Sequence, residues 1–217
     1  MKIMIGTPVY DGKLPAHYVD AMFNTYKLGV TKGHEIVPVY LCNDALVQRA
    51  RNDLFQMAYD SKVDYLFFID SDIIWNPEDF YKMLGHNLNI VLATYPKKQD
   101  LADFVIDTDT IPDLTTPLND VNGGGTAFMC LSAELIKTVY EASPEYSELH
   151  KKCRMVFDIG IQNGSLVGED ILFCRKAKTM GYKIYLDNTI NLTHIGQKLY
   201  SGNFHEYVKN FIEDKNI

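Results

Sequence analysis

Asp70 and Asp72 stand directly after the apolar run Tyr65 to Ile69. An apolar run without polar alternation is typical of a strand buried on both faces of a parallel sheet. In extended backbone, residues i and i+2 lie on one side, so both carboxylates can be directed to one point while Ser71 faces away. Open α/β sheets bind ligands at the carboxyl ends of their strands, and paired carboxylates suit a hard divalent cation that also holds phosphate. The spacing therefore indicates a metal and phosphate site, with a capped aspartate turn as the alternative.

Thr7, Tyr10 and Asp11 form a second candidate in the segment Gly6 to Gly12, which follows a first expected strand, Lys2 to Ile5. Turn-forming residues at the carboxyl end of a strand predict a loop where a ligand can bind. Hydroxyl groups, a stacking ring and a carboxylate are what a nucleoside pocket needs. An ordinary strand-to-helix loop explains the same residues, so both interpretations stay open.

Arg49 and Arg51 lie in the first turns of an expected helix that Asn43 or Asp44 can cap. Basic groups near a helix start oppose the helix dipole, which suggests another duty, such as holding a base or a phosphate. A solvated helix face is the alternative. From the helical period, the inward side of this helix carries Leu46, Ala50, Leu54, Met57 and Ala58.

The last third of the chain adds acidic residues and a histidine. Gly168-Glu169-Asp170 opens a helix expected over Ile171 to Met180. The helix dipole alone favours acids in a first turn, so a structural role for them is the alternative. His194 follows an expected strand near the chain end, and that placement makes it a candidate although a lone histidine is usually structural.

The remaining pattern alternates strands and helices, which predicts an α/β fold with a mostly parallel central sheet. The glycines Gly123 to Gly125 differ from a dinucleotide-binding motif, because no strand runs directly into them and a strand follows; they indicate a close approach to the backbone. Asp100 to Asp120 predicts a long mobile loop, and His205 to Ile217 a surface helix. Further helices are expected over residues 16–28, after Asn76-Pro77 and after Ser132, and further strands over residues 35–41, 90–94, 127–131, 183–186 and 189–193.

Composition limits the class of protein. The net charge of −7 argues against a general nucleic-acid binder, which would carry a basic face. No run approaches the roughly 20 apolar residues of a membrane span, and the apolar core of Met1 to Gly6 is too short for a signal peptide. We therefore expect a soluble, cytoplasmic chain that folds as one domain over residues 1–217, with a place as the N-terminal domain of a longer protein left open. The four cysteines, Cys42, Cys130, Cys153 and Cys174, lack a Cys-X-X-Cys pair and are expected as reduced thiols.

Taken together, Asp70-Ser71-Asp72, Gly168-Glu169-Asp170 and His194 resemble the nucleotide-diphospho-sugar glycosyltransferases of the GT-A fold. The likeness runs from Gly6 to about Lys198 and looks greatest toward glycosyltransferase domains of large chlorella viruses. Its most specific part is Val167-Gly-Glu-Asp-Ile-Leu-Phe-Cys174, followed by residues 181–187 and 193–196. The resemblance implies one Rossmann-like domain with helices on both sides of the sheet, in a viral enzyme that would act in the host cytoplasm. It would move a hexose from a UDP-sugar to a hydroxyl of a glycan or glycoprotein.

The resemblance also implies roles for single residues. Asp72 and His194 would hold a metal ion, Asp70 would touch the metal or the ribose, and Asp170 would face the acceptor hydroxyl. Carboxylates with one imidazole suit Mn²⁺ better than Mg²⁺. The nucleotide-sugar would lie against Thr7, Pro8, Tyr10, Asp44, Arg49, Asp70, Ser71, Gly124, Gly125 and Lys198.

The residue types agree with this chemistry. Cleavage of the sugar–phosphate bond expels a negative nucleoside diphosphate, so a metal and Lys198 would stabilise the growing charge. An acceptor hydroxyl is a poor nucleophile at neutral pH, and Asp170 can take its proton, which predicts direct displacement with inversion. Retaining enzymes of this fold also carry acidic residues nearby. Phe157-Asp158 stands where many relatives have a Trp-containing acceptor segment, so the acceptor's identity stays open.

Two other functions fit parts of the pattern. A haloacid-dehalogenase-type phosphatase also uses Asp-X-Asp after an apolar strand, but there the motif normally begins the domain, and here Ile73-Ile74 replaces the small polar residues expected next. A non-catalytic domain that binds nucleotide-sugars is the second alternative, against which the intact Asp72, Asp170 and His194 argue.

Overall fold

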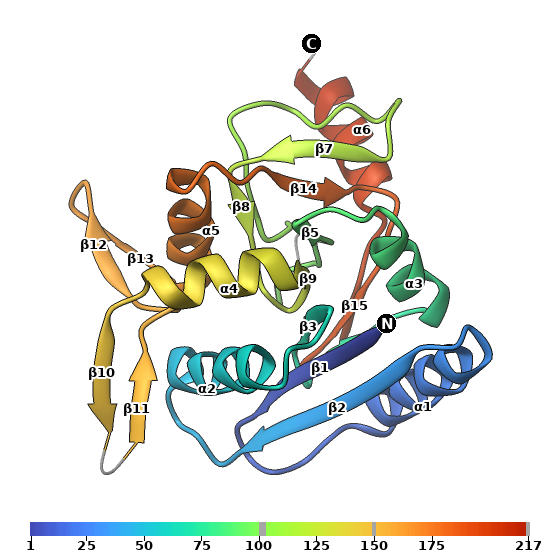
Figure 1. The fold of residues 1–217 in the computed structure, drawn as a ribbon. Coiled ribbons are helices and arrows are strands. Elements are labelled where there is room, and N and C mark those ends of the chain that lie inside the picture. The colour runs from blue at the N-terminus through green and yellow to red at the C-terminus, as the bar shows by residue number, and fades with distance from the viewer. Residues whose placement is uncertain (100–102, 149–150, 216–217) are drawn as a thin grey trace.

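The structure is a computed structural model that describes residues 1–99, 103–148 and 151–215 (Figure 1). Its helices are α1 (Ala16–Thr31), α2 (Val47–Asp60), α3 (Pro77–Gly85), α4 (Ala133–Ala142), α5 (Glu169–Thr179) and α6 (Phe204–Lys215). Its strands are β1 (Lys2–Val9), β2 (Glu35–Cys42), β3 (Tyr65–Ile69), β4 (Ile73–Ile74), β5 (Ile90–Leu92), β6 (Ile106–Asp107), β7 (Leu118–Val121), β8 (Gly123–Gly124), β9 (Phe128–Ser132), β10 (Glu145–Glu148), β11 (Lys151–Arg154), β12 (Gly160–Gln162), β13 (Ser165–Val167), β14 (Ile184–Asp187), β15 (Thr193–Ile195) and β16 (Leu199–Ser201).

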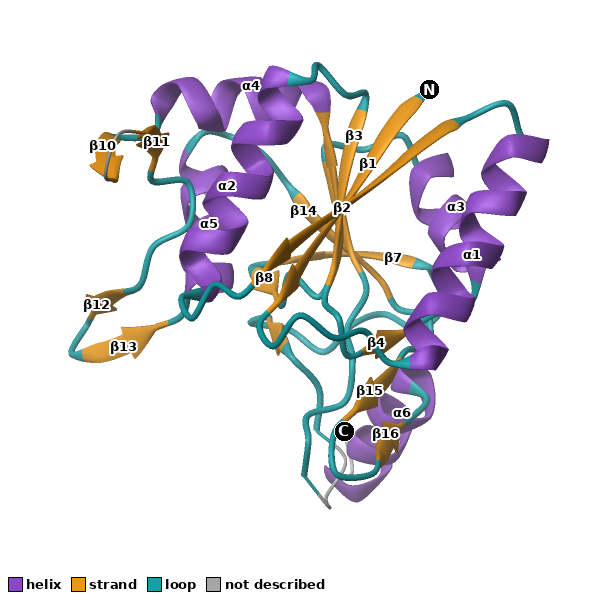
Figure 2. Ribbon diagram, turned by 90° about the horizontal axis from the view of Figure 1, so that it is seen from below, coloured by secondary structure: helices purple, strands orange, loops and turns teal. Residues whose placement is uncertain are grey.

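A central sheet of seven strands, in the order β2-β1-β3-β9-β5-β14-β7, carries the fold. β1 pairs in parallel with β2 and β3, and β14 pairs in parallel with β5. β9 is antiparallel to both of its neighbours, and β7 is antiparallel to β14. All strands of the sheet except β9 and β7 therefore run in one direction. In Figure 2, α1 and α3 cover one face of the sheet, and α2, α4 and α5 cover the other. This confirms the expected α/β architecture, a mostly parallel central sheet with helices on both faces.

β3 is buried on both faces, as its unbroken apolar sequence predicts. Leu66 and Phe68 pack in the core cluster shared with α2 and α4, whereas Phe67 and Ile69 pack in the cluster shared with α1 and α3. The alternation follows from the period of two along a strand. Burial of each such side chain stabilises the fold by about 1.5–3 kcal/mol, so the end of β3 is a well-anchored position for the residues that follow it.

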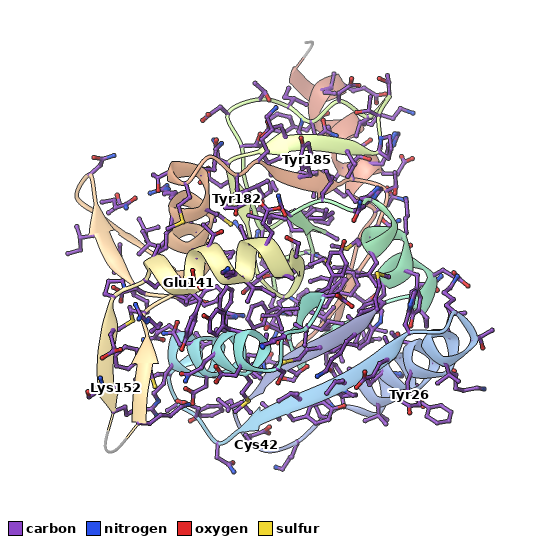
Figure 3. The ribbon with its side chains drawn as sticks, viewed as in Figure 1. Tyr26, Cys42, Glu141, Lys152, Tyr182 and Tyr185 are labelled. Carbon is purple, nitrogen blue, oxygen red and sulfur yellow. The ribbon has the colours of Figure 1, made fainter. Side chains whose placement is uncertain are left out.

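Local signals place several helices as expected. The Asn76 side chain caps α3 by accepting from the backbone N–H of Glu78, and Pro77 occupies the first helical position. Ser132 caps α4 in the same way. No helix within the described ranges is long and apolar enough to cross a bilayer. All four cysteines are free thiols; Cys42 lies exposed at the end of β2 (Figure 3), and the other three are buried.

The start of α2 differs from the expectation. β1 continues to Val9 in place of ending at Ile5, and α2 begins at Val47 with Leu46 at its N-cap and no side-chain cap. Asn43 has a positive φ of 62°, and the Asp44 carboxylate accepts from the backbone N–H of Leu46 outside the helix. The predicted capping role of Asn43 or Asp44 is therefore wrong. Of the side chains expected inward, Leu46 and Met57 are exposed and Ala50, Leu54 and Ala58 are buried.

The segment expected as one long loop contains strands. Within residues 103–120, Ile106–Asp107 forms β6 and pairs with the glycines of β8, and Leu118 begins the edge strand β7. A strand therefore does lead into the glycine run. The first part of that segment, residues 100–102, lies outside the described residues. Mobility of the segment stays a prediction.

Of two expectations near the chain end, the strand is wrong, and the surface helix is confirmed as α6, Phe204–Lys215. The strand expected over residues 189–193 is absent there, and β15 comprises Thr193–Ile195, so His194 lies within a strand and not after one. α6 has a buried side, where Phe204 and Val208 join the core. The ring of Phe104 lies 5.1 Å from that of Phe204, so the helix packs on the domain.

Candidate active site

The turn after β3 is joined to His194 by a small second sheet. β15 pairs with β4, so that His194 stands opposite Ile73, and the backbone N–H of Ile195 donates to the Asp72 carbonyl at 2.7 Å. Because β4 follows Asp72 immediately, this pairing places the histidine beside the aspartate. The distance from His194 Nε2 to Asp72 Oδ2 is 3.3 Å.

The hydrogen bonds of His194 suit a cation next to Asp72. Its Nδ1 lies 2.9 Å from the carbonyl oxygen of Pro96, which can only accept, so Nδ1 carries a proton. In the neutral ring, Nε2 then carries a lone pair, which faces the Asp72 carboxylate. Two acceptors in contact need a proton or a metal ion between them, and an imidazole that donates its other N–H to a backbone carbonyl is the usual form of a histidine metal ligand. The donor set of Asp72 and His194 therefore fits a divalent metal.

Lys98 is a further partner of Asp72. Its Nζ lies 2.5 Å from Asp72 Oδ2, the same oxygen that faces His194. Burial raises the pKa of Asp72, but the contacts with His194 and Lys98 outweigh this effect and lower that pKa to about 2. Asp72 is therefore ionised at any pH relevant to activity. No pattern in the sequence singles out Lys98.

Asp70 has a different partner, Arg51 of α2. The Arg51 side chain is only 5% exposed, and its Nη2 lies 2.9 and 2.8 Å from the two oxygens of Asp70. Its Nη1 forms an ion pair with Glu169. No group of three His, Cys, Asp or Glu side chains within the described ranges is placed to hold one metal ion. Asp70, Asp72 and His194 thus do not form such a group here, and a metal role for Asp70 stays a prediction.

Asp170 lies in the first turn of α5, beside this cluster. Burial raises its pKa, and the charges of Arg51 and Asp70 act on it. Its Oδ1 accepts from the backbone N–H of Ile171 at 2.7 Å. Gly168 leaves room for it, since a Cβ there would lie 3.0 Å from Oδ1. The neighbouring Glu169 forms an ion pair with Arg51.

The glycine run packs against Tyr95. Gly124 pairs with β6, and a Cβ on Gly125 would overlap the Tyr95 hydroxyl, so only glycine fits there. Tyr95 is buried, and burial raises its pKa. The centroids of the Tyr95 and His194 rings lie 5.2 Å apart in an edge-to-face arrangement. The buried Thr126 Oγ1 has no hydrogen-bond partner among the described residues. The glycine at position 125 thus lets Tyr95 pack beside the His194 ring.

The residues expected around a nucleoside lie at the ends of β1 and β2, on the same edge of the sheet as Asp70. The Thr7 hydroxyl is fully buried and lies 2.5 Å from that of Tyr18, so this side chain is already engaged. Pro8 is part of β1, and Tyr10 is 73% exposed after its end. Asp44 binds Arg49 at 2.8 Å, and Arg49 also reaches Glu148. Among the other residues expected there, Ser71 lies in the turn between Asp70 and Asp72, and the Lys198 ammonium stands over the Tyr200 ring.

Comparison with known proteins finds likeness in fold only. No protein-family model and no curated protein matches the chain. Among solved structures, A197 from STIV has a TM-score of 0.60 at 17% identity, over 94% of this chain and 95% of that chain. A glycosyltransferase involved in glycosylation of the major capsid of PBCV-1 scores 0.36 at 11% identity, over 65% of this chain and 66% of that chain. S. aureus TarS 1–349 in complex with UDP scores 0.43 at 15% identity, over 93% and 60%. The A197 match shows a shared fold, and the other two scores are too low to carry an argument.

Proposed function

We propose that this chain is a metal-dependent glycosyltransferase that moves a hexose from a UDP-sugar to a hydroxyl of a glycan or glycoprotein. The observation that carries the proposal is the pair Asp72 and His194 at the end of a central strand, with the histidine's other nitrogen bound to the Pro96 carbonyl. That arrangement is suited to a divalent cation. The fold and the partly buried carboxylate of Asp170 support the same activity.

Asp72 and His194 would hold the metal, Mn²⁺ in preference to Mg²⁺ because of the imidazole. When bound, the metal supplies charge that stabilises the departing nucleoside diphosphate. The protein's own part is to orient the donor at the edge formed by β1, β2 and β3. Lys198 is proposed to meet the diphosphate, and Asp44, Arg49 and Tyr10 the uridine.

Asp170 is proposed as the general base. Its raised pKa brings it closer to the pH at which a carboxylate can accept a proton from a hydroxyl as attack proceeds. One base on the acceptor side favours direct displacement, in which the acceptor oxygen forms its bond to the sugar as the phosphate oxygen leaves. The anomeric configuration is then inverted.

A phosphatase of the haloacid-dehalogenase type fits less well. In that chemistry the first aspartate attacks phosphorus and needs an open carboxylate oxygen. Both oxygens of Asp70 accept from the buried guanidinium of Arg51, so the residue is held as an ion-pair partner. This contact favours transfer from a nucleotide-sugar over a covalent aspartyl-phosphate.

Hydrolysis of a panel of UDP- and GDP-sugars, with Mn²⁺ and with chelator, tests the proposal. We expect a UDP-hexose to be cleaved only with metal, and Asp72→Ala to remove the metal-dependent part. Preference for a GDP-sugar would overturn the uridine pocket. Equal UDP affinity in chelator would overturn the metal role, and release of phosphate from simple phosphomonoesters would favour the phosphatase.

A further inference from the structure

Lys98 and the expected metal ion would bind the same oxygen. The Lys98 ammonium lies 2.5 Å from Asp72 Oδ2, and the same Oδ2 faces His194 Nε2 at 3.3 Å. The ammonium and a metal ion on one oxygen would lie only a few ångströms apart. At that distance the repulsion between them is substantial even in a partly exposed site. The two cations therefore compete for Asp72.

The backbone holds Lys98 where it can change partners without leaving the site. Pro96, two residues earlier, is fixed by its hydrogen bond to His194, and it pairs with Phe104 in an isolated β-bridge. The aliphatic stem of Lys98 passes over Gly196, where a Cβ would lie 3.2 Å from Lys98 Cδ. The backbone near Lys98 is thus held in place, and the aliphatic stem of Lys98 packs against Gly196.

The ion pair is only partly buried, which makes exchange easy. The side chains of Lys98 and Asp72 are 39% and 34% exposed. Pairs of this kind contribute little net stability, because water and salt already screen them. A divalent cation on Asp72 and His194 would therefore release the ammonium at small cost.

We propose that Lys98 is a donor-binding residue that occupies Asp72 before metal binds and then turns its ammonium to the diphosphate of the nucleotide-sugar. This rests on the proposed metal-dependent function of the site. The released ammonium remains beside the metal position, and a diphosphate bound to that metal brings unpaired oxygens within reach of a flexible lysine stem. Lys98 would then oppose metal binding in the free protein and favour nucleotide binding in the loaded one.

Calorimetry on the full chain tests this through two affinities that change in opposite directions. Lys98→Met keeps the stem and removes the charge. We expect this variant to bind Mn²⁺ alone about two- to fivefold more tightly than the parent does. At saturating Mn²⁺, its affinity for UDP should fall by about tenfold or more, as for loss of a charge-assisted hydrogen bond. Lys98→Arg, which keeps the charge, should stay near the parent in both.

The adjacent lysine provides a matched control. Lys97 binds Asp103 at 2.6 Å and is similarly exposed, but it does not contact Asp72. Lys97→Met should leave both affinities unchanged. If Lys98→Met weakens Mn²⁺ binding, or leaves UDP affinity at the parent value while the parent itself binds Mn²⁺ and UDP, the role of Lys98 is refuted and the proposed function stands. If the parent binds neither Mn²⁺ nor UDP, the proposed function fails and the role of Lys98 fails with it.

Discussion

The buried guanidinium of Arg51 gives the sharpest test of how this site is held together. It joins Asp70 at the end of β3 to Glu169 at the start of α5. Arg51→Met removes the charge, retains much of the volume, and leaves two carboxylates facing a site without their cation. Removal of one partner from a buried ion pair costs about 3–5 kcal/mol.

The two carboxylates are not fully buried, which lowers the expected cost. The Asp70 side chain is 25% exposed and that of Glu169 is 14% exposed, so water relieves part of the penalty. We expect Arg51→Met to lower the free energy of unfolding by about 3 kcal/mol at pH 8. For a domain of this size, that corresponds to a fall in melting temperature of roughly 6–12 °C.

The loss should depend on pH. Burial raises the pKa of Glu169, and the charge of Arg51 opposes that rise. Without Arg51 the pKa rises further, so the folded variant binds its proton more tightly than the unfolded chain does. Stability from such a group is fully present below the ordinary glutamate value of about 4.3 and is lost as the pH rises through the raised pKa. The deficit of Arg51→Met should therefore be smaller at pH 5 than at pH 8.

Urea denaturation followed by circular dichroism at both pH values measures this difference. Arg49→Met is the matched control, because Arg49 lies two residues away on the more exposed face of α2 and should give a much smaller loss. The double variant Arg51→Met/Glu169→Gln should recover part of the stability at pH 8. A loss below about 1 kcal/mol at pH 8, or the same loss at pH 5, would refute a stabilising role for the Arg51 charge.

The other predictions concern the proposed base and the glycine run. Asp170→Asn should lower the transfer rate by about 100- to 10,000-fold and leave the affinities for UDP and Mn²⁺, measured by calorimetry, unchanged. Asp158→Asn changes an exposed carboxylate, and a similar loss in that variant would contradict Asp170 as the base. Burial raises the pKa of Asp170, so the apparent pKa on the acidic side of the pH–rate profile, measured at saturating donor, should lie above the ordinary aspartate value of about 4. An apparent pKa at or below that value would contradict Asp170 as the base. Gly125→Ala should lower the melting temperature because its Cβ would overlap the Tyr95 hydroxyl, whereas Gly85→Ala in α3, where a Cβ meets nothing within 4 Å, should raise stability by up to about 1 kcal/mol. Equal melting temperatures of these two variants would show that Tyr95 moves aside freely.

Local patterns predicted the parts of the fold that depend on nearby residues. The unbroken apolar run of β3 indicated burial on both faces, and Asn76-Pro77 marked the start of α3, because each signal acts within one turn or one strand. The edge strand β7 gave no such signal. Only two of its four residues, Leu118 and Val121, are apolar, and it becomes a strand because β14 offers free backbone groups on its edge.

A local sequence pattern could have predicted the position of Arg51 but not that of Lys98. Arg51 shares a helix face with Phe55 and Ala58, which lie four and seven residues later and are buried. The helical period could therefore have shown that Arg51 points inward and Arg49 does not, because residues two apart on a helix do not share a face. Lys98 lies outside any periodic element. Its contact with Asp72 depends on the path of the chain past β15, which no local pattern encodes.

The arrangement of the site follows from where the long-range contacts fall. The pairing of β4 with β15 fixes Asp72 against His194, and the buried Arg51 fixes Asp70 against Glu169. Asp70 and Asp72 are two residues apart, and Glu169 is next to Asp170. The position proposed for the donor and the position proposed for the base are thus separated by one guanidinium, whose planar fork of donors allows little change in geometry. A lysine has no such fork, so the spacing of Asp70 and Glu169 depends on an arginine at position 51.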